Sequence, residues 1–449
     1  MYIPHSEAER DEMLAAIGID KIDALFEAVP EKFRFPNLRL DPGRSEYEVE
    51  LELKDIAKAN LTVDEIPCFL GAGAYKHIIP AAVDAIISRS EFYTAYTPYQ
   101  PEISQGTLQS IFEFQTLIAR LTGMEAANAS HYDGATACAE AGILALHHHR
   151  GKRSKILVSA GLNPMYRSTM RTYLQDLDGT KAESPQVMKK ISEVSPDSLI
   201  EAIDEDTSLV MIQVPDFFGQ IWDYSALVKA AHEKGALVAV CANPIALALL
   251  KSPGSMDADI VVGEGQPLGM PLSFGGPYLG FFAVRKELVR KMSGRIVGET
   301  VDARGQRGYV LTLTAREQHI RREKATSNIC SNQGLNALTA AVYMSLMGKK
   351  GMQEVAQQCY EKAHYAARKI SKIRGYKIVS HTPFFHEFAV RCPIPAFEVD
   401  EMLLNHGILG GLDLGRLDPA LEDTMLFAVT EANTREEIDD LCAVLAEVG

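Results

Sequence analysis

The chain has 449 residues, with 45 Lys and Arg against 59 Asp and Glu, so its formal net charge is −14. This acidic balance argues against a nucleic-acid-binding protein, because sequence-independent contact with phosphates needs a basic face. Hydrophobic residues at 47% and charged residues at 23% are ordinary globular values and exclude wholesale disorder. The length predicts about two or three domains.

No stretch of about 18 or more uncharged apolar residues is present, so no membrane-spanning helix is predicted. The segment Met1–Arg10 is acidic and carries no signal or transit pattern, which favours a cytoplasmic protein. The cysteine count of seven is odd and includes no C-x-x-C pair, so neither a disulfide framework nor a zinc site is indicated. We expect most of the cysteines to be buried thiols.

The N-terminal part of the chain, residues 1–60, has the pattern of two or three acidic helices separated by prolines. We therefore expect an N-terminal helical arm there. A glycine-bearing turn follows at Gly71–Tyr75. Apolar residues at helical spacing then predict a helix from Gln105 to Gly123.

Five short apolar runs follow, and helical segments separate most of them. The runs are residues 155–159, 208–214, 236–240, 259–262 and 279–284. Continuous apolar strands that alternate with helices are typical of a mostly parallel sheet with both faces covered. The sequence thus predicts a large α/β domain over residues 61–327.

The chain beyond residue 328 has a different order of elements. Helical patterns at Gln333–Gly348 and Met352–Ile373 lead into three predicted strands and a closing acidic helix, at residues 376–379, 385–390, 425–429 and 434–448. This order predicts a smaller α+β domain over residues 328–449.

A large α/β domain followed by a small α+β domain resembles fold type I pyridoxal 5'-phosphate (PLP) enzymes, which are transferase-like in architecture. Such enzymes need a phosphate loop at a helix N-terminus, a carboxylate for the pyridine nitrogen and a Schiff-base lysine. The candidate phosphate loop is Ala129–Ala137, where small residues open a helix. Asp133 within this loop is equally well explained as an ordinary helix N-cap.

The other two requirements of a PLP site are missing. No carboxylate occurs in Val240–Pro244, directly after the third predicted strand. No lysine lies between Lys251 and Lys286, the stretch in which the anchor should follow the fourth strand. The sequence therefore indicates a PLP-type fold whose own site is degenerate.

Residues 93–106 form a polar segment that packing alone explains badly. Tyr93, Tyr96 and Tyr99 alternate there with two prolines and several amide or hydroxyl groups. Prolines stiffen a loop, and tyrosines can pack a cofactor or donate a proton. A surface loop buried at a subunit contact is the alternative explanation.

A second segment, residues 318–328, carries several charges and ends in Thr326, Ser327 and Asn328. These three side chains could bind a phosphate or a carboxylate. A charged segment of this kind more often forms an exposed helix end. The adjacent histidines 147–149 have no partner at i+4, so no metal site is expected there.

Residues 71–80, 93–106 and 321–330 together resemble the P-protein of the glycine cleavage system, glycine dehydrogenase (decarboxylating), and most closely subunit 1, the alpha subunit of its two-subunit form. The likeness runs over nearly the whole chain. It implies an oxidoreductase that condenses glycine with PLP, releases CO₂ and transfers the aminomethyl group to the lipoyl arm of H-protein.

The resemblance also implies how the work is divided between subunits. Subunit 2 would bind PLP covalently through a lysine at the position that corresponds to residues 266–268 here, and the assembly would be an α₂β₂ tetramer. This chain would complete the partner's site. The residues expected to face the partner's cofactor and glycine are Tyr93, Tyr96, Tyr99 and Gln100. Thr326 is expected to reach the partner's PLP phosphate across the interface, with Ser104 and Gln105 as further cofactor contacts.

Two alternatives stay open at this point. The first is a self-sufficient PLP lyase or aminotransferase anchored through Lys251, Lys286 or Lys324, each of which is wrongly placed relative to the fourth strand. The second is a noncatalytic scaffold of a PLP enzyme. Mutation of the tyrosine segment in a scaffold would weaken assembly without changing the chemistry.

Overall fold

The computed structural model describes residues 5–447, except 37–38, 95, 176–180, 184–190, 192–193, 331 and 381–382. The chain divides into two units, Met1–Leu61 and Thr62–Gly449. In the described ranges, no helix is both long enough and apolar enough to cross a membrane. All seven cysteines are free thiols, and only Cys330 is exposed.

The first unit is helical, as the sequence predicts. Its elements are α1 (Glu7–Ile17), two 3₁₀ turns, η1 (Ile22–Phe26) and η2 (Glu31–Phe33), and α2 (Glu46–Ala57). Both α-helices begin with a capping box, formed by Ser6 with Glu9 and by Ser45 with Glu48. No described residue of this unit is buried, and large apolar side chains such as Leu53 are exposed.

The second unit is built on a seven-stranded sheet with the order β1-β7-β6-β5-β4-β2-β3. The strands are β1 (Ala126–Ala127), β2 (Lys155–Val158), β3 (Lys181–Glu183), β4 (Thr207–Val214), β5 (Leu237–Ala242), β6 (Ile260–Glu264) and β7 (Gly280–Val284). Strands β3, β2, β4, β5 and β6 are parallel, whereas β7 and β1 run antiparallel to their neighbours. The five predicted strands and the mostly parallel sheet are confirmed.

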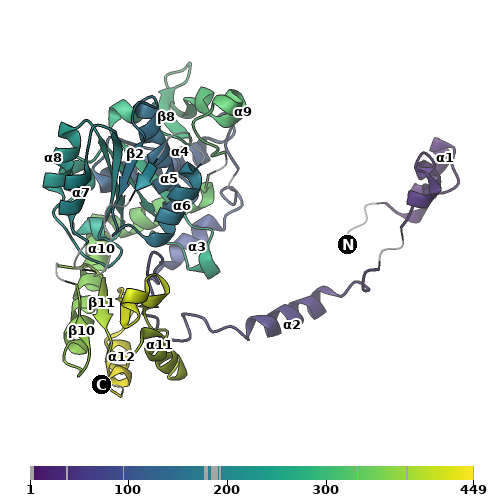
Figure 1. The fold of residues 1–449 in the computed structure, drawn as a ribbon. Coiled ribbons are helices and arrows are strands. Elements are labelled where there is room, and N and C mark those ends of the chain that lie inside the picture. The colour runs from purple at the N-terminus through teal and green to yellow at the C-terminus, as the bar shows by residue number, and fades with distance from the viewer. Residues whose placement is uncertain are drawn as a thin grey trace. The chain divides into compact units, whose positions relative to one another are not determined.

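Helices cover both faces of this sheet, because successive side chains of a strand point to opposite sides. In β4, Val210 and Ile212 pack with α4 (Gln105–Thr122), α7 (Pro196–Ala202), α8 (Ser225–Glu233) and the first part of α10 (Gly334–Ile370). Leu209 and Met211 pack with α5 (Gly134–His148) and α6 (Pro164–Leu174) on the other face (Figure 1). The core therefore consists of one apolar layer on each side of the sheet.

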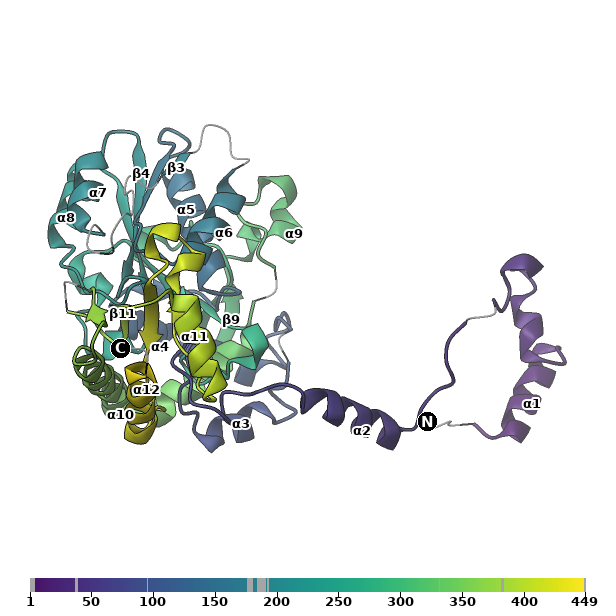
Figure 2. The same cartoon turned by 60° about the horizontal axis from the view of Figure 1, so that its bottom comes forward.

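A four-stranded antiparallel sheet with the order β10-β11-β13-β12 follows towards the C-terminus. Its elements are β10 (Lys377–Ile378), β11 (Glu387–Arg391), α11 (Ala396–Asn405), β12 (Leu412–Asp413), β13 (Thr424–Ala428) and α12 (Arg435–Ala446). Helix α12 packs beside α10, as Figure 2 shows.

Gly348 interrupts α10 with a φ of 57°, close to the break predicted between two helices. Residue 448, the last of the predicted closing helix, lies outside the described residues.

The remaining elements connect the two sheets or lie at the edge of the large one. They are α3 (Ala81–Ile87), the hairpin β8 (Ile296–Val301) and β9 (Arg307–Thr312), α9 (Gln318–Arg321), and the 3₁₀ turns η4 (Ala246–Ala248), η5 (Pro253–Met256), η6 (Ser273–Gly275), η7 (Lys286–Leu288), η8 (Thr314–Arg316), η9 (Arg322–Lys324), η10 (Leu414–Arg416) and η11 (Pro419–Leu421). The sequence did not predict the β8–β9 hairpin. Each strand has one buried residue, Val297 in β8 and Tyr309 in β9, among partly buried or exposed ones, so the hairpin lacks the continuous apolar run of the central strands.

Segment 67–80 contacts both sheets of the second unit. The Tyr75 backbone exchanges two hydrogen bonds of 2.9 Å with the Gln266 side chain, in the turn after β6. The Tyr75 hydroxyl and the Ala72 amide each donate to the Glu387 carboxyl group at 2.7 Å, at the start of β11. Gly71 allows this fit, because a Cβ there would lie 2.5 Å from the Ala428 side chain.

Glu387 makes the stability of the fold depend on pH. Burial raises the pKa of Glu387 from 4.5 to about 7, so the folded protein holds this proton more tightly than the unfolded chain does. The stabilisation is present below about pH 4.5 and is lost as the pH rises through about 7, and its size is about 3 kcal/mol. We expect Glu387→Gln, which stays neutral, to remove this part of the fall in unfolding free energy between pH 4.5 and 7, measured by chemical denaturation.

Glu422→Gln, which changes an exposed carboxylate, is the matched control and should retain the wild-type pH dependence. An equally steep fall in Glu387→Gln and in the wild type would contradict the assignment to Glu387.

Candidate functional site

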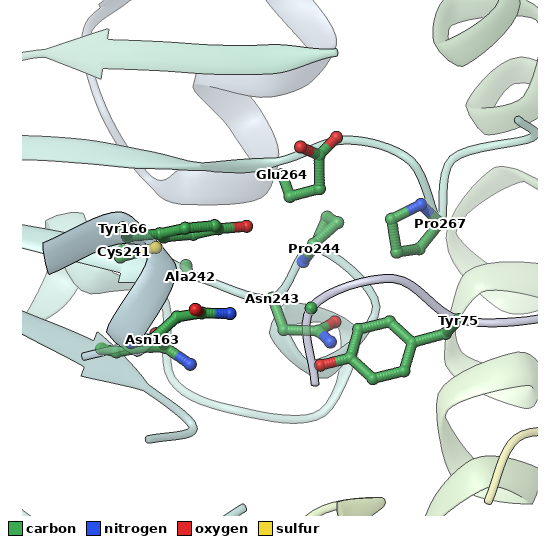
Figure 3. Close-up of a pocket in the computed structure, with 11 residues that line it drawn as sticks. Tyr75, Asn163, Tyr166, Cys241, Ala242, Asn243, Pro244, Glu264 and Pro267 are labelled. Carbon is green, nitrogen blue, oxygen red and sulfur yellow. The ribbon is translucent and has the colours of Figure 1, made fainter. Parts of the chain in front are cut away.

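The carboxyl ends of β4, β5 and β6 meet at the edge of the large sheet, where open α/β folds commonly bind ligands. A cavity at this edge is lined by Tyr75, Tyr166, Cys241, Asn243 and Glu264, among others. Figure 3 shows that these side chains surround the cavity from segment 67–80, α6, β5, the turn after β5 and β6. This is the place where a PLP enzyme of the expected fold would hold its cofactor.

The N-terminus of α5, predicted as a phosphate loop, already has protein acceptors. Asp133 is the N-cap and its carboxylate accepts from the Thr136 amide at 2.7 Å. The Glu264 carboxyl group accepts from the amides of Gly134, Gln266 and Leu279 at 2.9 to 3.1 Å. Of the two explanations for Asp133, the structure therefore shows the helix cap, and a second acidic side chain stands where a phosphate would need open amides.

Glu264 is the residue that most changes the chemistry of this edge. Burial raises the pKa of its carboxyl group to about 7, against the three amide donors that lower it. Sequence reasoning missed Glu264 as part of the site, although its position at the end of an apolar strand was a usable signal.

The cavity does not fit PLP. Its volume is about 30 Å³, which is space for about two water molecules and not for a pyridine ring with its phosphate. No lysine occurs at residues 252–285, and none of the alternative anchors Lys251, Lys286 and Lys324 lines the cavity. The residues present at the sheet edge thus supply neither the room nor the covalent anchor.

The tyrosines of residues 93–106 lie on the surface instead of at this edge. The exposed fractions of Tyr93, Tyr96 and Tyr99 are 69%, 74% and 44%, and Gln100 is also exposed. Residue 95 of this loop is outside the described residues. The rings of Tyr96 and Tyr99 meet edge to face at 6.0 Å, so the loop presents a pair of contacting aromatic side chains.

Arg295 brings the tyrosine loop together with the second polar segment. This side chain, at the start of the β8–β9 hairpin, donates from Nη2 to the Tyr99 hydroxyl oxygen at 2.8 Å. The same Nη2 lies 3.1 Å from the Glu317 carboxylate, and His319 Nδ1 lies 3.6 Å from that carboxylate. Sequence reasoning missed Arg295 and Glu317, because the residues they connect are about 200 positions apart and the hairpin that carries Arg295 was not predicted.

Thr326 is exposed and lines two neighbouring cavities. The smaller one, about 20 Å³, is also lined by Arg295 and Glu317, and the larger one measures about 390 Å³. Next to it, the Ser327 hydroxyl donates to the Glu140 carboxyl group at 2.6 Å. Thr326 therefore shares a cavity wall with Arg295, whose guanidinium group contacts Tyr99 of the tyrosine loop.

Ser104 and Gln105 lie at the start of α4. Ser104 precedes the helix, and the Gln105 side chain exchanges hydrogen bonds of 2.8 and 2.9 Å with the Tyr309 backbone in β9. The side-chain amide of Gln105 thus joins α4 to the hairpin. Of these two residues, Ser104 is the better candidate for a contact with another molecule.

The rings of His148 and His149 meet edge to face at 4.9 Å, and each ring also has a polar contact of its own. His148 Nδ1 lies 3.2 Å from Lys291 Nζ, whereas His149 Nε2 lies 3.2 Å from the Ser208 carbonyl oxygen. Among the described residues, the group of potential metal ligands that does converge is His77, Cys359 and Glu431. His77 and Cys359 are each hydrogen-bonded to Glu431, at 2.7 and 3.2 Å, which accounts for the cluster as part of the packing around segment 67–80.

Comparisons with known proteins agree with this architecture. The family model of the glycine cleavage system P-protein matches residues 1–445. The probable glycine dehydrogenase (decarboxylating) subunit 1 of Thermomicrobium roseum is 49% identical over 447 residues, with 100% of this chain and 99% of that protein covered.

Two solved structures extend the comparison to the fold. A crystal structure of an inhibitor-bound glycine decarboxylase, the P-protein of the glycine cleavage system, superposes with a TM-score of 0.90 at 42% identity and covers 100% of both chains. The sphingosine-1-phosphate lyase of Burkholderia pseudomallei superposes with a TM-score of 0.67 at 15% identity, covers 94% of both chains, and shows the fold alone. The predicted fold type I PLP-enzyme architecture is confirmed. The family match and the full-length identity show that the chain belongs to the glycine cleavage system P-protein family, among the members named glycine dehydrogenase (decarboxylating) subunit 1.

Proposed function

We propose that this chain is the subunit of a two-subunit glycine decarboxylase that completes, without binding PLP itself, an active site held by subunit 2. The observation that carries the proposal is the contrast between two places in the fold. The sheet edge is filled by Tyr75, Tyr166 and Glu264 and has no lysine, whereas the polar motif residues gather on an exposed surface.

The exposed surface has the chemistry that a glycine site needs. Tyr93, Tyr96, Tyr99 and Gln100 offer neutral hydroxyl and amide donors, which would orient the glycine carboxylate without the strong attraction of a cation. The nearby positive charge of Arg295 is offset by Glu317 at 3.1 Å. A carboxylate that is held weakly can leave as CO₂, and the PLP of subunit 2 supplies the electron sink.

Thr326 supports the proposal from the second segment. Its hydroxyl is exposed beside the tyrosine loop, so a cofactor phosphate on the partner subunit could accept a hydrogen bond from it. Ser104 is a further candidate contact for the partner's cofactor, and Gln105 would act by holding α4 against the hairpin.

The wider assembly belongs to the same proposal. Exposed aromatic and apolar side chains, which include Tyr93, Tyr96, Ile103 and Ile320, are suited to a subunit interface. We expect an α₂β₂ tetramer in the cytoplasm that decarboxylates glycine and passes the aminomethyl group to the lipoyl arm of H-protein. Two-fold symmetry is the commonest symmetry among soluble oligomers.

The first test is covalent trapping of the cofactor. The purified chain, alone and mixed with subunit 2, is incubated with PLP, reduced with borohydride and measured by intact mass spectrometry. We expect a phosphopyridoxyl adduct on subunit 2 and none on this chain, because residues 252–285 contain no lysine. The control is the Lys251→Arg, Lys286→Arg and Lys324→Arg triple variant.

An adduct on the chain alone that disappears in the triple variant would establish a self-sufficient PLP enzyme and overturn the proposal. Trapping on subunit 2 together with unchanged glycine chemistry in all tyrosine-loop variants would instead establish the noncatalytic scaffold.

Thr326→Ala tests the contact across the interface. Loss of a hydrogen bond to a charged phosphate should weaken PLP binding by the assembled enzyme about tenfold. Titration of the assembled apoenzyme with PLP, followed by absorbance, measures the affinity. Thr326→Ser keeps the hydroxyl and is expected to bind PLP as the wild type does. Equal affinities in all three proteins would remove Thr326 from the cofactor site.

A further inference from the structure

Arg295 is an enclosed cation beneath an otherwise exposed surface. Its side chain is 4% exposed, whereas that of Glu317 is 10% exposed and Tyr99 is 44% exposed. A buried arginine must be paired, because removal of a full charge from water costs several kcal/mol or more. Glu317 supplies the opposite charge, and Tyr99 takes the second contact.

The backbone that carries Arg295 is fixed to the large sheet. The Ala129 amide donates to the Arg295 carbonyl oxygen at 2.7 Å, and Asn128 Nδ2 donates to the Ser293 carbonyl oxygen at 3.0 Å. Gly294 has a φ of +77°, and a Cβ there would lie 2.6 Å from Asn128 Nδ2. Only glycine fits this close approach, so the base of the arginine side chain has a defined position.

Besides its ion pair with Glu317, the Arg295 guanidinium group makes two contacts with Tyr99. Nη2 donates to the phenol oxygen at 2.8 Å, and the guanidinium carbon lies 5.4 Å from the centre of the same ring. Because the phenol oxygen accepts this hydrogen bond, its own O–H is free to donate in another direction. Tyr99 as a whole is exposed, so a partner chain can reach this residue.

We propose that Arg295 is a positioning residue for Tyr99. It fixes the phenol oxygen and turns the phenol proton outward, towards the glycine site that subunit 2 holds and this chain completes. Glu317 offsets the charge, so the tyrosine donates to the substrate while the arginine does not attract the glycine carboxylate. This inference rests on the proposed function and assigns a role to a residue that no motif of the sequence indicated.

A double-mutant cycle tests the inference in the enzyme assembled with subunit 2. The exchange of labelled bicarbonate into glycine is measured for Arg295→Gln, Tyr99→Phe and the double variant. We expect each single variant to lower kcat for exchange by about tenfold or more, since misplacement of a reacting group has effects of this size. We expect Arg295→Gln to add little to the loss in Tyr99→Phe, because the arginine acts through the tyrosine.

Two further variants separate positioning from general destabilisation. Arg295→Lys retains a cationic donor opposite Glu317 and should recover part of the exchange rate. Arg307→Gln alters an exposed arginine that lies over the Tyr309 ring in the same hairpin, at 5.8 Å, and should behave as the wild type. Thermal unfolding and size-exclusion chromatography with subunit 2 establish that each variant folds and assembles. If Arg295→Gln does not fold or assemble, Arg295→Lys takes its place in the cycle.

The outcomes distinguish the inference from the function on which it rests. If Tyr99→Phe exchanges bicarbonate at the wild-type rate, the tyrosine-loop part of the proposed function fails, and the inference fails with it. If Tyr99→Phe is impaired but Arg295→Gln reduces exchange by the same factor in both backgrounds, only the positioning role of Arg295 is overturned.

Discussion

The fit of segment 67–80 between the two sheets is the constraint on which the rest of this structure depends. Its backbone uses the hydrogen-bonding groups of Gln266 on one side and of Glu387 on the other. Burial of a polar group costs free energy unless the group is hydrogen-bonded. These hydrogen bonds therefore fix the position of the small sheet relative to the strand ends of the large sheet. The same segment contributes Gly73 and Tyr75 to the walls of the cavity at the sheet edge.

This constraint explains how a PLP-enzyme fold can persist in a chain whose sheet edge has no room for PLP. The apolar layers on both faces of the sheet depend on strand and helix packing, to which a cofactor-binding lysine would not contribute. At the strand ends, Glu264 and Asp133 accept from the amides that would otherwise meet a phosphate. The backbone amides at this sheet edge are therefore hydrogen-bonded within the protein.

Under the proposed function, the residues that this chain contributes to catalysis lie at the surface of the second unit. The tyrosine loop comes from the segment before α4, and Thr326 comes from the segment after α9, with the β8–β9 hairpin between them in the fold. The Arg295–Glu317 pair joins these pieces in a largely buried position, where an ion pair specifies geometry more than it adds stability. A surface of this kind can complete a neighbouring active site, because its polar groups are exposed while their supports are not.

The sequence by itself determined the central strands of the large sheet, the long helices α4 and α10, and the absence of a lysine after the fourth predicted strand. Continuous apolar runs such as those of β4 and β6 predict buried parallel strands because hydrophobic periodicity is a local property. The tertiary structure alone decided that Glu264 sits against the N-terminus of α5 and that Tyr99 meets Arg295. Both contacts join residues far apart in the chain, and the second also involves the hairpin, which carries no strong local signal. Periodicity and motif spacing therefore could not predict them.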